Sequence, residues 1–204
     1  MSDIRYKTII AANHLYFCPP GGTVSGGSGV IGRTVKPGAS DWKKVGIVDS
    51  FTPNNEQEEV EITAPLNYLN QTVRKVSHTL KMKYDVNLKS VDNFVMSAIF
   101  MCDFPSEENT ELVTFSPGSK AAHEGWFKWM QVDPGDGDNP NKDADGNVIL
   151  TILDIYGSYT VDGYAPKNTE GATPTLHITQ LYSTKNKGLF NRNGIYIAAV
   201  NNNG

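Results

Sequence analysis

Cysteine is scarce in this chain of 204 residues, which has only Cys18 and Cys102. The two lie far apart and form no C-x-x-C pair, so a structural zinc site is not expected. So little cysteine is typical of proteins from a reducing compartment. Long apolar runs are missing too, because none approaches the ~18 residues that span a membrane. Residues 1–17 do not have the pattern of a signal peptide. We therefore expect neither a zinc-stabilised fold nor a membrane protein.

The chain also has no excess of positive charge. It contains 18 Lys and Arg against 22 Asp and Glu, for a net charge of −4. Without a basic stripe it is a poor candidate for gripping nucleic acid. The acidic residues cluster at positions 56–61, 107–111 and 133–145, and they could repel nucleic acid from a surface that they line. A hydrophobic content of 39% predicts a folded domain rather than wholesale disorder.

The spacing patterns of common enzymes are absent. Neither H-E-x-x-H nor G-x-S-x-G occurs, and neither cysteine has a familiar nucleophile context. Gly27, Gly29 and Gly32 match G-x-G-x-x-G, but the sequence RTVKPG that follows cannot begin the helix that a dinucleotide site needs. We expect a loop over Pro19–Gly32, no catalytic residue and no cofactor.

One acidic loop partly resembles a calcium site. Asn141, Asp143 and Asp145, followed by Gly146, match the first half of a calcium-binding loop. The twelfth position should be a bidentate Glu, and here it is Ile152. The three residues are therefore a weak calcium candidate, and a solvated acidic hairpin loop is the competing interpretation.

Strand patterns, by contrast, are abundant. Residues 72–86 alternate strictly between apolar and polar, which predicts a half-buried strand. In the preceding acidic run, Glu56–Thr63, Val60 and Ile62 share one face while Glu59 and Glu61 share the other. Opposite charges on the outer faces of these two strands would pair across a sheet or across a subunit boundary.

One helix is expected, over about residues 90–101. Ser90 can cap its first turn, and Asp92 complements the helix dipole. Apolar residues cover nearly its whole circumference, which predicts burial on more than one side. Either the helix is wedged between sheets or it contacts a neighbouring subunit. The residues proposed for such a contact are Phe94, Val95, Met96, Ile99 and Phe100.

The remaining patterns predict a mainly β chain. Further strands are expected near residues 9–17, 45–51, 126–132, 148–156, 159–164, 175–184 and 195–200. Eight to ten strands with one flanking helix favour a single β-sandwich or barrel-like domain. Within it we expect an N-terminal strand and Gly-rich loop (1–40), a core (41–190), and a C-terminal strand with a polar tail (191–204).

The order of these segments resembles that of a phage major tail (tail tube) protein. The similarity lies in DWKKVGIVDSFTP (41–53), the acidic strand, the alternating strand and the helix SVDNFVMSAIF (90–100). It continues through 125–131, 148–157 and 173–183, so that it covers about residues 41–190. The resemblance is one of pattern and order.

This resemblance implies a structural virion protein with a β-sandwich fold and one flanking helix. In that family six copies join their inner strands into a ring, and rings stack into a tube through which DNA passes without specific binding. The implied partners are the chain itself, the tape measure protein, the tail terminator and baseplate components. The implied location is the virion tail, assembled in the host cytoplasm, with no enzymatic activity.

Two sets of expectations follow for particular residues. The lumen-lining candidates are Asp49, Glu59 and Glu61, chosen for their strand face and charge. The helix residues 94–100 are expected to be buried partly by another chain. An alternative function is an extracellular, calcium-stabilised carbohydrate-binding or adhesion module, which would use the aromatic strand Trp126–Trp129 and the Asp133–Asp145 loop.

Overall fold

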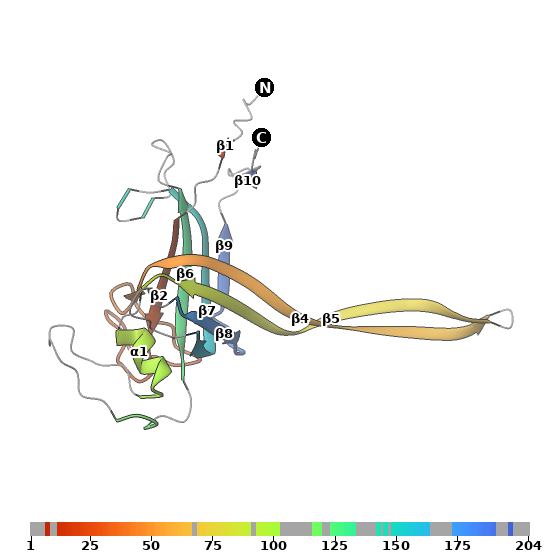
Figure 1. Ribbon diagram of the computed structural model, residues 1–204, viewed down its shortest axis with the longest axis horizontal. Helices are drawn as coiled ribbons and strands as arrows, with labels where there is room; N and C mark the ends of the chain where they lie inside the picture. The colour runs from red at the N-terminus through yellow and green to blue at the C-terminus, as the bar shows by residue number, and fades with distance from the viewer. Residues whose placement is uncertain are drawn as a thin grey trace.

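The computed structural model confirms a mainly β fold with one α-helix (Figure 1). It describes residues 7–8, 12–66, 69–90, 93–102, 116–119, 123–133, 142–143, 145–146, 148–163, 173–190 and 196–197. Within these residues the strands form one large sheet and one small parallel pair, β1 (Lys7–Thr8) with β10 (Tyr196–Ile197).

The large sheet has eight strands, and all its pairings are antiparallel. In spatial order the strands are β3 (Lys43–Val45), β2 (Ala12–Cys18), β6 (Glu124–Asp133), β7 (Val148–Asp162), β8 (Thr175–Gln180), β5 (Leu69–Leu88) and β4 (Val48–Leu66). The eighth strand, β9 (Lys187–Phe190), pairs with β7 beside the segment that β8 occupies.

This sheet curls so that it supplies both walls of the main core. Phe51 of β4 stacks on Trp129 of β6, four strands away in the sheet, with ring centroids 4.3 Å apart. Phe17 lies at the centre, against the rings of Phe94, Phe127 and Tyr159. The helix α1 (Asn93–Ile99) closes one side of this core with Phe94, Val95 and Ala98. A single curled sheet plus one helix therefore makes the barrel-like body.

The outer face of the sheet is covered by the loop between β2 and β3, residues 19–42, which we call the strap. Beneath it Cys18, Ile31, Trp126 and Tyr156 form a second buried cluster. The indole Nε1 of Trp126 donates to the Gly32 carbonyl at 2.8 Å, which fixes the strap to β6. After Gly32 the strap makes a tight turn rather than a helix, as expected for a loop.

Several predicted strand boundaries are wrong, and the strand expected over 175–184 ends at Gln180. The expected strand 45–51 is broken at Gly46, whose φ of 25° takes it out of the β region, and it is divided between β3 and β4. The expected break between 148–156 and 159–164 does not occur, because β7 runs through Gly157 as one strand of 15 residues. The Ser90 hydroxyl accepts a hydrogen bond from Ile47 N at 2.6 Å and so ties this junction together, while Asp92 and the start of the predicted helix at 91–92 lie outside the described residues.

The largest departure from the predicted layout is a long arm. The acidic run is not a separate strand but part of β4, whose 19 residues pair from end to end with the 20 residues of β5. Only Lys83–Asn87 of β5 pair with another strand, β8. Beyond this root, residues 55–66 and 69–82 project from the body as a two-stranded ribbon, which we call the arm (Figure 1).

Irregularities in the ladder change which residues share a face. The register shifts between Glu56 and Gln57, opposite a skipped Leu80, and again between Ile62 and Thr63. A β-bulge interrupts the alternation of faces and increases the local twist. The strict alternation over 72–86 therefore does not place one continuous face on the core. Tyr84 and Val86 are buried, and Met82, where the arm meets the body, is half-buried against the core, whereas Lys81 is already exposed.

Candidate functional site

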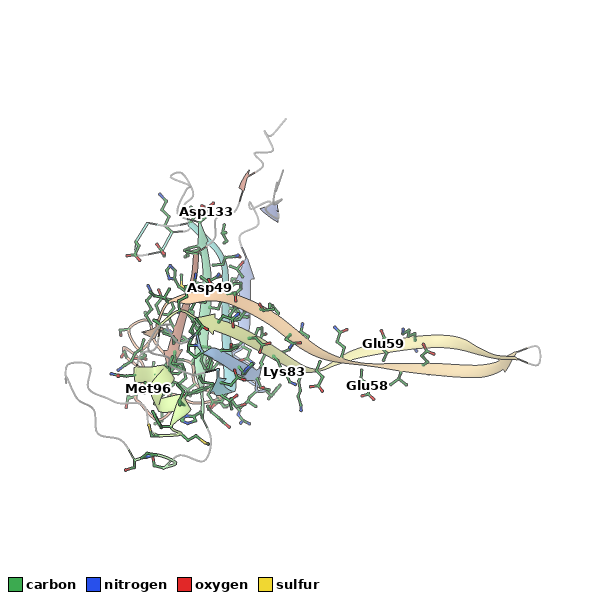
Figure 2. The ribbon with its side chains drawn as sticks, viewed as in Figure 1. Asp49, Glu58, Glu59, Lys83, Met96 and Asp133 are labelled. Atoms are coloured by element: carbon green, nitrogen blue, oxygen red, sulfur yellow. The ribbon has the colours of Figure 1, made fainter. Side chains whose placement is uncertain are left out.

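Ion pairs link the two strands of the arm, and Figure 2 shows Glu58 and Glu59 along the arm and Lys83 nearer the body. Lys75 Nζ of β5 lies 2.5 Å from Glu59 and 4.0 Å from Glu61 of β4. Nearer the body, Lys83 Nζ lies 3.1 Å from Glu56, and its hydrogen bond and charge lower the pKa of that carboxyl. The predicted attraction between the two charged strands thus occurs within one chain, where it holds the two strands of the arm in register.

These pairs bear on the three lumen candidates. Glu59 and Glu61 lie on the arm and share Lys75, while Asp49 near the root pairs with Lys89 at 2.6 Å. All three side chains are about half exposed. Because each carboxylate has a lysine partner, the arm repels an approaching anion less than the acidic run alone suggests. Their position along a lumen stays a prediction.

The face of the arm opposite Glu59 and Glu61 carries a small exposed apolar patch between charged side chains, with Glu58 two residues before Val60 and Arg74 opposite Ile62. Val60 is 42% exposed and Ile62 is 50% exposed, and they lie two residues apart on the same face of β4. The register pairs Val60 with Val76 of β5. In the described part of the chain, β4 pairs with no strand but β5, so its outer edge offers free backbone N–H and C=O groups along its length.

The helix residues divide into two groups. Phe94 and Val95, expected at a subunit boundary, are 2% and 0% exposed because they pack in the core of their own chain. For these two the prediction is wrong. Met96, Ile99 and Phe100 are only half-buried. They keep a surface that another chain could cover, and that contact stays a prediction.

At the root of the arm, polar side chains from four strands form a connected row that the sequence did not reveal. Asn54 of β4 donates to Asp85 of β5 at 3.3 Å. His177 of β8 places Nδ1 2.6 Å from Asp85 and Nε2 3.0 Å from Asp162 of β7. Alternation along β8 could have placed His177 on an outer face. Its partners depend on the register of three strands that are distant in sequence.

A cavity of about 400 Å³ lies beside this row. The C-terminal part of α1 forms one wall, and β7 and β8 form the other. Its lining includes Ile99, His123, Thr160, His177 and Thr179. The cavity therefore gives the row one face toward solvent.

The calcium candidate is described only in part. Asn141 lies outside the described residues, and Asp145 N donates to Asp143 Oδ1 at 3.0 Å, as in a solvated turn. Nowhere in the described ranges do three metal-binding side chains come together. The aromatic strand proposed for a carbohydrate is largely internal, because Trp126 is 0% and Phe127 1% exposed. Neither ring offers a surface to a sugar.

Among the described residues there is no helix that is both long and apolar enough to cross a membrane. A comparison with known protein families and with characterised proteins finds no match to this chain.

Proposed function

We propose that this chain is a structural subunit that self-assembles into rings, six copies to a ring, which stack as the tail tube of a phage and form the conduit for its DNA. The proposal joins the segment order of the sequence to the shape of the subunit. The implied partners beyond the chain itself are the tape measure, tail terminator and baseplate proteins.

The single observation that carries the proposal is the arm. A two-stranded ribbon is marginally stable in water by itself, and stability normally requires a third strand or a packed face. Here the ribbon projects from the body, and its apolar patch, Val60 and Ile62, is exposed (Figure 1). Such a ribbon gains most by lying against another subunit, which covers the apolar patch and adds strands to the free edges.

The half-buried helix residues support the same conclusion. Met101 follows α1 and is 44% exposed, next to the partly covered Met96, Ile99 and Phe100. Together with the arm, the subunit thus has two apolar surfaces at different places. A subunit with two distinct contact surfaces can make heterologous contacts that close into rings.

The test replaces the two exposed apolar residues of the arm, Val60 and Ile62. We expect Val60→Ser/Ile62→Ser to abolish rings and tubes, because the arm then has little apolar surface to bury. The free energy of unfolding of the monomer should change by less than about 0.5 kcal/mol, since both side chains are exposed. Assembly is scored by electron microscopy of the concentrated protein and by sedimentation velocity.

The matched control is Val30→Ser, because Val30 is 61% exposed but lies on the strap. It should assemble as the wild type does. A wild-type protein that remains monomeric at high concentration would refute the proposal. A double variant that assembles normally would refute the role of the arm.

A further inference from the structure

The geometry at His177 favours the cationic form of its ring. Both ring nitrogens lie within hydrogen-bond distance of a carboxylate oxygen, Nδ1 at 2.6 Å from Asp85 and Nε2 at 3.0 Å from Asp162. A carboxylate only accepts, and a neutral imidazole has only one N–H to donate. With Asp85 and Asp162 both ionised, both contacts are hydrogen bonds only when the ring is the doubly protonated cation.

His177 lies where the arm joins the body, so its protonation can affect how the arm is held. The arm is joined to β8 by five residue pairs, Lys83–Thr179 to Asn87–Thr175. His177 lies opposite Asp85 at the middle pair of this short ladder. Through Asp162 its ring also reaches β7, in the centre of the body. The charged ring thus links the root of the arm to β7, a strand with which β4 and β5 do not pair in the described residues.

We propose that His177 is a proton-controlled tie between the arm and the body: the cationic ring holds Asp85 of β5 and Asp162 of β7 together, and loss of its proton lets the arm swing more widely. The contact to Asp162 is the one that breaks. That carboxylate is 70% exposed and can turn into water, whereas Asp85 is 33% exposed and retains the shorter contact. The consequence for assembly rests on the proposed function, because the angle of the arm would set how one subunit meets the next.

The surrounding charges favour the cation. Partial burial works against a charged ring, but the hydrogen bonds and charges of Asp85 and Asp162 outweigh it and raise the pKa of His177. Conversely, the hydrogen bond from His177 is the main cause that lowers the pKa of Asp85. The other nearby groups are Lys83, which pairs with Glu56, the uncharged Asn54, and His123 in the same cavity.

The stabilisation that His177 contributes decreases as the pH rises. Because the pKa of His177 is higher in the folded protein than in the unfolded chain, its stabilisation is complete below the unfolded value, near 6.5. This stabilisation is lost as the pH rises through the pKa of His177 in the folded protein. The tie is therefore closed in mildly acidic solution and open in alkaline solution.

The tie can be tested without relying on assembly. Spin labels at Glu58→Cys on the arm and Tyr182→Cys on the body, which is 80% exposed, report their separation by double electron–electron resonance. Mixing with excess unlabelled protein removes signals between subunits. Cys18 and Cys102 are buried, and burial raises the pKa of Cys18 to about 11, so neither competes for the label.

We expect a narrow distance distribution at pH 6 and a broad one at pH 9. The His177→Gln variant should give a broad distance distribution at both pH values. The His14→Gln variant, which changes a histidine on β2, should behave as the wild type does. In NMR titrations of the ring, His177 should lose its proton at a lower pH in Asp162→Asn than in the wild type.

Wild-type distance distributions of equal width at both pH values would overturn the proposal. A width that still changes with pH in the His177→Gln variant would overturn it too. If rings form but the widths stay equal, only the tie fails. If the widths change but no rings form, only the proposed function fails.

Discussion

Phe17→Ala should lower the free energy of unfolding by about 3–5 kcal/mol, the usual cost of removing a buried phenylalanine ring. Phe17 is 1% exposed and lies within 5.2 Å, between ring centroids, of Phe94, Phe127 and Tyr159. It is thus the point at which β2, β6, β7 and the helix meet. The loss would remove a large part of the 5–15 kcal/mol that stabilises a typical domain.

Urea denaturation followed by circular dichroism, at a concentration where the protein is monomeric, measures this change. The control is Tyr182→Ala, which removes an aromatic ring that is 80% exposed and should cost less than about 0.5 kcal/mol. A similar loss in both variants would show that Phe17 is not the centre of the core.

The second large effect is expected at Lys36 of the strap. Its Nζ lies 2.5 Å from Asp154 Oδ2 on β7, and the Asp154 side chain is only 8% exposed. The other oxygen, Asp154 Oδ1, is buried without a hydrogen-bond partner. Lys36→Met leaves this carboxylate buried with its strongest partner gone, which should cost about 2 kcal/mol.

Two further variants separate charge from packing. Lys36→Met/Asp154→Leu removes the buried charge as well and should be more stable than Lys36→Met alone, because an apolar pair can replace a buried ion pair. Lys44→Met on β3 removes an exposed lysine and should change little. If the midpoint of urea denaturation of Lys36→Met equals that of the wild type, the ion pair does not hold the strap in place.

The fold class could be predicted because patterns of residues close in sequence determine which segments form strands and which forms the helix. Alternation and β-branched residues indicate strands such as β6 and β8, and the apolar arc of 94–100 indicates the one helix. The loop interpretation of the glycine motif also followed from local chemistry, because residues after Gly32 could not begin a helix. In each case the residues that decide the structure are close in sequence.

The arm and the row at its root could not be predicted, for physical reasons. Whether the acidic run is a separate strand or the middle of β4 depends on bulges at Glu56 and Ile62, which leave no clear mark in the sequence. The partners of His177 depend on the register of β5, β8 and β7. Phe94 and Val95 were assigned to a subunit boundary because periodicity cannot tell burial in one's own core from burial in a neighbour.

The pairing of β2 with β6 has a consequence for biosynthesis. Its register joins residue 12 to residue 132, so the centre of the sheet cannot close until most of the chain has left the ribosome. The two strands of the arm, by contrast, are separated by only two residues of sequence and can pair as soon as they emerge. The nascent chain can therefore form the arm, with its unpaired strand edges, before the sheet closes, and lysines such as Lys75 and Lys83 on that ribbon disfavour premature edge-to-edge association.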